Sequence, residues 1–238
     1  MKPGFCFWKS SIANLAAVPT SDVRYQQALP NIIDDLEQRL YRELDLLNTL
    51  VADSSSVASL NTRVFNLPTS TGTFVVLERI NIITPAGQTN PDLGTRNPVT
   101  PASKEMLDFM WPSAVGSTVP QYFAMRTQNQ VLFGPYPDQA YTVEVSGTQR
   151  PAPLSTTNVT TLLSVYFPDL TIAAGMVAMS AEMKNWGAMA DDPKMAQSWE
   201  AHYQQLIQSA QVEEARKKFT SQGWSSKQPA QLATPPRT

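Results

Sequence analysis

The stretch from Leu29 to Val51, LPNIIDDLEQRLYRELDLLNTLV, constrains the fold of this chain more than any other. Its apolar residues recur at steps of three or four, which places them on one stripe of an α-helix. The stripe comprises Ile32, Ile33, Leu36, Leu40, Leu44, Leu47 and Val51. The opposite face carries the polar residues Asp34, Asp35, Glu37, Gln38, Arg42 and Asp45, which suit water. We therefore expect one long helix with a buried stripe, and with Pro30 early in it, where the missing N–H costs nothing.

The composition indicates a globular, lightly charged chain. Its 238 residues suffice for one large domain or two small ones. Only 16% of the residues are charged, which suits a subunit buried in an assembly, and the net charge of −2 argues against a nucleic-acid-binding protein. No apolar run approaches the ~20 residues that cross a membrane, so no membrane partner is expected. Cys6 is the only cysteine, which excludes an intrachain disulfide and a cysteine-rich zinc site.

A β region is predicted in the middle of the chain, where β-branched and alternating apolar residues replace the helical period. The expected strands are 62–67, 74–83, 122–126, 130–133 and 141–146. In the second of these, the side chains expected on one face are Phe74, Val76, Ile80 and Ile82. In the last, Tyr141, Val143 and Val145 alternate with Thr142, Glu144 and Ser146, which predicts a half-buried antiparallel strand.

Connecting segments are expected between these strands. Residues 53–56 and 84–100 are predicted to be loops without regular structure, because they are rich in serine or in proline and glycine. Residues 101–110 are predicted to form a short helix that ends before Pro112 and is capped by Thr100 or Ser103.

The helical period returns near the end of the chain. A helix rich in small residues is expected at 170–190, and Asp192-Pro193 begins a second helix that runs to about Phe219. The stripe of this second helix comprises Met195, Trp199, Tyr203, Leu206 and Ala210. In the first 28 residues, two short helices are expected near 12–16 and 22–28. The aromatic residues Phe5, Phe7 and Trp8 fit either a flap on the main core or an interface patch.

The order of elements predicts an α+β fold. A helical bundle of the long early helix and two C-terminal helices would carry an inserted antiparallel β region and an extended C-terminal tail. The expected division is 1–60 and 154–219 for the helical domain, 61–153 for the β region and 220–238 for the tail.

Catalytic and cofactor-binding motifs are missing from the sequence. His202 is the single histidine and is interpreted as structural or surface-exposed, and Cys6 lies close to a chain end. No GxSxG, GxxxxGK[ST] or GxGxxG motif occurs. We therefore expect no enzyme activity, no catalytic residues, no metal and no cofactor.

The C-terminal residues after Glu214 carry basic side chains and no acidic ones. The basic residues are Arg216, Lys217, Lys218, Lys227 and Arg237. One interpretation is a solvated helix end, where cations suit the helix dipole. The other is a basic arm that docks on a partner or passes near DNA, with Trp224 as its anchor. Both interpretations stay open on these residues alone.

Seven segments, taken in order, resemble the head–tail adaptor proteins of tailed bacteriophages, also called head completion or neck connector proteins. The first is the helix at 29–44, and each later one is a short motif. They are Trp111-Pro112, the GSTVPQYFA of 116–124, the VLFGPYPDQAYTVEV of 131–145, Arg150-Pro151, the YFPDL of 166–170 and the WEAHY of 199–203. The resemblance spans about 29–219 and leaves the N-terminal MKPGFCFWKSS and the tail outside it.

The resemblance implies a structural virion protein. Such adaptors form a ring, usually twelve-fold, beneath the portal protein, connect the capsid to a tail or nozzle protein, and extend the channel through which double-stranded DNA passes without sequence-specific binding. The chain would be made in the cytoplasm of the host bacterium. The portal-binding residues would be Trp224, Arg216, Lys217, Lys218, Lys227 and Arg237. The alternatives are a phage enzyme such as a cell-wall hydrolase, or another neck or tail-completion ring protein.

Overall fold

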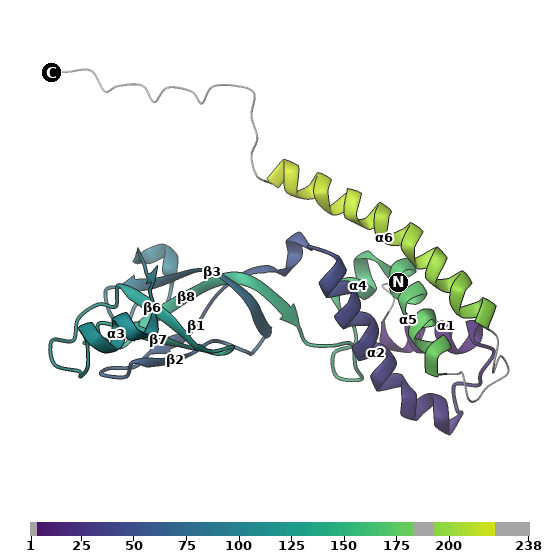
Figure 1. Ribbon diagram of the computed structural model, residues 1–238, viewed down its shortest axis with the longest axis horizontal. Helices are drawn as coiled ribbons and strands as arrows, with labels where there is room; N and C mark the ends of the chain where they lie inside the picture. The colour runs from purple at the N-terminus through teal and green to yellow at the C-terminus, as the bar shows by residue number, and fades with distance from the viewer. Residues whose placement is uncertain (1–3, 183–192, 222–238) are drawn as a thin grey trace, which may run out of the picture.

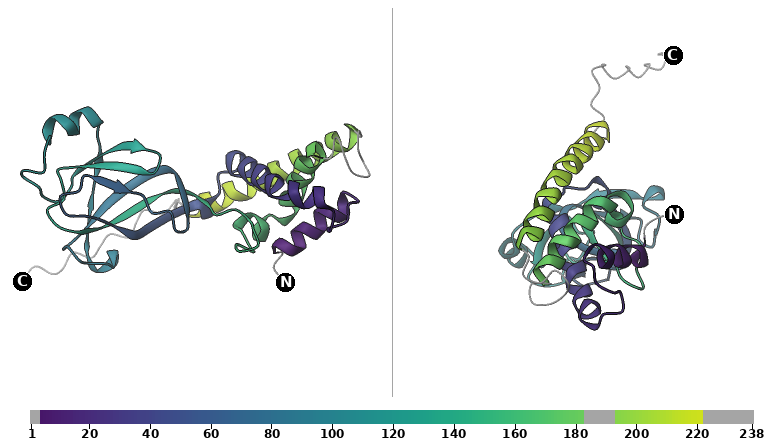
Figure 2. Two further views of the ribbon diagram at one scale, coloured as in Figure 1. Left: turned by 90° about the horizontal axis from the view of Figure 1, so that it is seen from below. Right: turned by 90° about the vertical axis from the view of Figure 1, so that its right-hand side faces the viewer.

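The computed structural model describes residues 4–182 and 193–221 of the chain. A helical part and a β part lie side by side along the longest axis of the molecule (Figure 1). The view from below shows the same separation (Figure 2). The described chain begins with helices, continues through the strands of two sheets and returns to helices, which confirms the predicted α+β fold.

The long early helix, α2 (Val23–Glu43), begins and ends earlier than predicted. Its N-cap is Asp22, whose carboxylate accepts the N–H groups of Arg24 and Tyr25, so Pro30 lies inside the helix and not in its first turn. The predicted stripe is buried from Ile32 to Leu44. Its last two members lie in other elements, Leu47 in the 3₁₀ turn η1 (Leu47–Thr49) and Val51 in a strand.

One residue of the polar face of α2 is buried. Glu37 is only 5% exposed, so its assignment to the water-facing side was wrong. Its carboxylate accepts the backbone N–H of Leu154, at the exit from the β part. Periodicity misses such a contact because the partner is distant in the sequence.

The helical part is completed by four further helices. These are α1 (Phe5–Leu15), α4 (Leu162–Tyr166), α5 (Pro168–Glu182) and α6 (Pro193–Ser221). Trp8 and Ile12 of α1 are buried against α5, where a Cβ added to Gly175 would lie 2.7 Å from Cζ2 of Trp8. The small residues of α5 therefore allow close packing, and α1 is the predicted flap on the core.

The boundaries of these helices differ from the expected ones. The expected helix at 22–28 is the first part of α2, and residues 162–166 form a separate helix that was not predicted. Residues 183–190 and the expected N-cap Asp192 lie outside the described residues. Along α6, Tyr203 and Ala210 are buried as predicted, together with Ile207 and Glu214.

The β part is a sandwich of two four-stranded sheets. One sheet has the order β1 (Leu50–Ala58), β8 (Tyr141–Pro151), β3 (Gly72–Thr84) and β4 (Thr95–Pro98). The other has the order β2 (Val64–Asn66), β7 (Gln130–Gly134), β6 (Tyr122–Thr127) and β5 (Thr100–Pro101). Apolar side chains of both sheets form the core between them, with Ile80 opposite Val145 in the register of β3 and β8.

Four expectations for the β part were wrong. The segment 53–56 belongs to strand β1, and 84–100 contains the 3₁₀ turn η2 (Pro91–Leu93) and strand β4. Val76 is 52% exposed, because a register shift between Phe74 and Val76 interrupts the alternation of β3. Strand β8 is buried on both faces, so Thr142 and Glu144 do not face water.

The short helix α3 (Lys104–Met110) confirms the expected helix near 101–110. Ser103 is its cap and accepts the N–H of Met106. Leu107 packs on the second sheet with Ala124 and Leu132. The helix therefore covers the outer face of the second sheet, the face that is turned away from β3 and β8.

Candidate functional site

Helix α6 is held against α2 by a cluster of charged and aromatic side chains. The guanidinium of Arg39 donates to both carboxylate oxygens of Glu200, from Nη1 at 2.9 Å and from Nη2 at 2.6 Å. It also lies 4.1 Å from the centre of the Tyr203 ring. The hydroxyl of Tyr203 donates to Glu43 on α2 at 2.8 Å. This arrangement fixes the position of α6 and therefore the point from which the C-terminal residues continue.

The C-terminal end of α6 places two of the predicted portal-binding residues beside acidic groups. The Nζ of Lys217 lies 2.6 Å from Glu213 and 2.8 Å from Glu214, and hydrogen bonds to these carboxylates raise its pKa. Lys218 forms an ion pair with Asp45. Glu214 is itself buried and accepts the backbone N–H of Leu47 at 3.0 Å. Lys217 and Lys218 therefore help to fasten α6 to the turn after α2.

Of the other four predicted portal-binding residues, only Arg216 lies within the described part of the chain. Arg216 is exposed on α6. Trp224, Lys227 and Arg237 lie outside the described residues. The spacing of Glu213 and Glu214 before Lys217 was a readable signal for pairing within the helix. The pairing of Lys218 with Asp45 could not be found in this way, because it joins residues far apart in the sequence.

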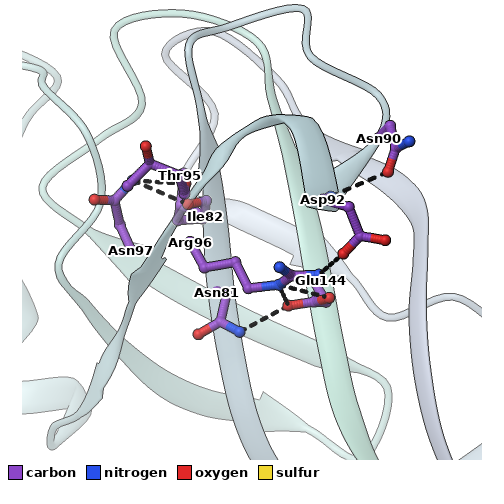
Figure 3. A network of polar contacts seen from close by, with 8 residues as sticks. All are labelled: Asn81, Ile82, Asn90, Asp92, Thr95, Arg96, Asn97 and Glu144. Atoms are coloured by element: carbon purple, nitrogen blue, oxygen red, sulfur yellow. Dashed lines mark hydrogen bonds and ion pairs between the residues drawn. The ribbon is translucent and has the colours of Figure 1, made fainter. Parts of the chain in front are cut away.

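A second polar cluster lies on the β part, where Arg96 of β4 meets Glu144 of β8 (Figure 3). The Nε of Arg96 lies 3.0 Å from Oε2 of Glu144, and its Nη2 donates to Asp92 at 2.7 Å. Asn81 of β3 donates to the same Glu144 oxygen at 2.8 Å. The cluster fastens β4 and the turn before it to the outer face of the first sheet.

The charge arrangement of this cluster indicates a structural role. Burial alone would raise the pKa of the Glu144 carboxyl. Hydrogen bonds from Arg96 and Asn81 outweigh the burial and hold that pKa below its ordinary value. A general acid or base needs a pKa close to the working pH. Glu144 is therefore a fixed anion that binds Arg96.

Exposed apolar side chains gather around α3, at the end of the β part that points away from the helices (Figure 1). Phe109 of α3 is 85% exposed and Val115, in the loop that follows, is 87% exposed. Met106 and Met110 are also exposed. Large apolar side chains that face water in one group are typical of protein interaction surfaces.

The described residues contain no group of three or more histidine, cysteine or acidic side chains that could hold a metal ion. Within the same part of the chain, no helix combines the length and apolar character needed to cross a membrane. His202 is exposed, as expected, and its ring contacts Trp199 edge-on with the ring centres 6.0 Å apart.

Comparison with known proteins assigns the family. No curated protein matches the chain. The family model described as SU10 adaptor protein matches residues 9–226, which is wider than the resemblance at 29–219 and includes most of α1 and the beginning of the expected tail. The match covers the helical part, the β part and α6, so it concerns the whole architecture. The chain belongs to the SU10 adaptor protein family and is a structural head–tail adaptor protein of a bacteriophage.

Proposed function

We propose that this adaptor forms the ring beneath the portal of a tailed phage, connects the capsid to a tail or nozzle protein, and extends the DNA channel. The proposal rests on the family match together with the two-ended shape of the molecule. DNA passes through the channel without sequence-specific contacts, in keeping with the net charge of −2. The ring is twelve-fold, as in the adaptors that the sequence resembles.

The observation that carries the proposal is the separation of two different surfaces on one elongated chain. The β end presents Phe109 and Val115 to water, whereas the described end of α6 is fastened beside the turn after α2, where Lys218 pairs with Asp45. A chain with unlike surfaces at separate places can contact two different neighbours at once. This supports a connector between two assemblies over a protein that acts alone.

We assign portal docking to the C-terminal arm, residues 220–238 together with Arg216. The arm contains Trp224, Lys227 and Arg237 and no acidic residue. A buried aromatic residue can supply much of the binding free energy of an interface, and positive charges accelerate association with an acidic surface. Lys217 and Lys218 belong to the same basic stretch as Arg216 and add to its positive charge, and their ion pairs with Glu213, Glu214 and Asp45 also hold the end of α6 in place.

Deletion of residues 220–238 tests this assignment. The helical core ends before this segment, so the truncated protein keeps its thermal midpoint, while attachment to portal-containing heads is lost. The matched control is Trp224→Ala in the full chain, which removes the anchor and keeps the length. Attachment of the truncated protein at the normal level would place the docking surface in the folded part.

The assembly route gives a second test. We propose that the purified protein is monomeric in dilute solution and forms the ring only on the portal. Analytical ultracentrifugation measures the first state, and a low-resolution map of the virion neck shows the second. A stable dodecamer without portal would contradict templated assembly, and a map with this chain elsewhere in the particle would contradict the proposed position.

A further inference from the structure

A pocket of about 300 Å³ lies where the helical part meets the β part. The end of α2 forms one side, from Tyr41 to Asp45, and the end of β8 forms another, from Thr148 to Arg150. The apolar part of its wall includes Leu44 and the half-exposed Val75 and Val76 of β3. None of the residues that line the pocket belongs to the exposed apolar group around α3.

The acidic residues that line this pocket already have cationic or hydrogen-bonding partners. Glu43 accepts hydrogen bonds from Arg39 at 2.9 Å and from Tyr203 at 2.8 Å. Asp45 forms its ion pair with Lys218. Glu43 and Asp45 therefore interact with Arg39 and with residues of α6, and they form no ion pair with the basic residues of the pocket.

The basic residues of the pocket, Arg42 and Arg150, form no ion pair with any described residue. Arg42 makes one side-chain hydrogen bond, to the amide oxygen of Gln38 at 2.8 Å. Arg150 is partly buried, and its Nε is shielded from water and has no acceptor. The hydroxyl of Tyr41, which also lines the pocket, is buried without a partner as well. Two cations and a hydroxyl donor thus line one pocket, and neither the Nε of Arg150 nor the hydroxyl of Tyr41 has an acceptor among the described residues.

A guanidinium that is removed from water without an anion costs free energy, and this cost is recovered when an anion completes its hydrogen bonds. A carboxylate fits best, because its two oxygens match the planar fork of arginine. We propose that this pocket binds the carboxylate of an aspartate or glutamate side chain from another protein chain in the assembled particle. The apolar wall of the pocket can pack against the methylene groups of an aspartate or glutamate side chain and against the residues next to it in the partner chain. A small free anion and the phosphates of duplex DNA offer no such apolar groups, so the wall favours the side chain.

The stability of the isolated protein provides the first arm of the test. Because Arg150 has no partner in the single chain, Arg150→Met leaves the thermal midpoint unchanged or raises it. A residue that serves the fold would behave differently. A fall of more than about 4 °C would show that Arg150 stabilises the chain itself and would overturn the proposal. Arg126→Met, at an exposed arginine of β6, is the matched control.

Acetate is the probe for the second arm, in solution with the full chain. The Nε–Hε NMR signal of Arg150 should shift in a saturable way as acetate replaces chloride at constant ionic strength. The signal of Arg126 should show only a small linear change. Equal behaviour of the two signals, or no shift of the Arg150 signal, would contradict a carboxylate site.

Photocrosslinking inside assembled particles forms the third arm and identifies the source of the carboxylate. A photoreactive benzoylphenylalanine at Val76, which is half-exposed, should link the chain to a peptide of another protein molecule that contains an acidic residue. Adding Arg150→Met should reduce the crosslink at least about tenfold, while Arg126→Met leaves it unchanged. An unaffected crosslink, a linked peptide without acidic residues, or no crosslink to another chain would overturn the proposal. The crosslink is measured in particles that carry the full-length chain, so the result of the arm deletion does not enter this readout and the two proposals can fail separately.

Discussion

Both carboxylate oxygens of Glu37 lie within hydrogen-bond distance of the backbone N–H of Leu154, at 3.2 and 3.3 Å. Glu37 belongs to α2, and Leu154 follows β8, so this contact joins the helical part to the exit of the β part. Burial raises the pKa of Glu37 from 4.5 to about 7, although the Leu154 N–H and Thr161 act in the opposite direction.

The raised pKa of Glu37 predicts that stability falls as the pH rises through the range from about 4.5 to about 7. In this range the folded protein keeps the proton of Glu37, whereas the unfolded chain releases it. Below this range Glu37 is protonated in both the folded and the unfolded state, and its contribution to the stability of the fold is fully present. The pKa difference corresponds to about 3 kcal/mol in the free energy of unfolding.

Glu37→Gln should remove this part of the pH dependence, because the amide oxygen still accepts the Leu154 N–H and carries no charge. Urea unfolding at pH 5 and pH 8 measures the change. Asp35→Asn, at an exposed carboxylate on the same helix, is the control and keeps the wild-type slope. If the free energy of unfolding changes equally between pH 5 and pH 8 in the wild type and in Glu37→Gln, Glu37 is not desolvated as described.

Leu40 tests the core of the helical part. Its side chain is fully buried, so Leu40→Ala should lower the free energy of unfolding by about 2–5 kcal/mol. Leu40→Asp should abolish soluble folded protein, because a buried unpaired charge costs several kcal/mol. Asn31→Asp places the same acid at an exposed position of α2 and should fold normally. Normal melting of Leu40→Asp would refute burial of the stripe.

The pairing of Arg39 with Glu200 should couple α2 to α6. Both side chains are partly exposed, so solvent screening limits the expected coupling free energy to about 0.5–1 kcal/mol in a double-mutant cycle with Arg39→Ala and Glu200→Ala. Arg39→Lys should recover only part of it, because lysine lacks the planar fork that contacts both oxygens. Additive effects of the two alanine substitutions would mean that the pair contributes nothing.

Arg96→Met should loosen β4, because Glu144 would then keep only Asn81 as a partner. Hydrogen exchange of the amides of residues 95–97 should accelerate, while exchange in the hairpin of β6 and β7 stays unchanged. Because the pKa of Glu144 is held low, the stabilising effect of its ion pair is present above its ordinary pKa and is lost as the pH falls below it. Unchanged exchange in β4 would show that its backbone pairing alone holds it.

Local patterns in the sequence determined much of the fold. The stripe from Ile32 to Leu44, the hairpin around 127–129 and a cap at either Thr100 or Ser103 were predicted because each depends on neighbours a few residues away. The basic side chains after Glu214 were likewise apparent in the sequence, although their role as a docking arm stays a prediction.

Tertiary structure decided which polar residues are buried and which charges are neutralised. Strand β1 was missed because its serines suit a loop, and only pairing with β8 makes the segment a strand. The burial of Glu37, the ion pair of Lys218 with Asp45 and the unpaired guanidinium of Arg150 all depend on elements distant in the sequence. Periodicity reports which side of an element is apolar. The free energy of a charge depends on what packs against it, and that is settled only when the helical and β parts meet.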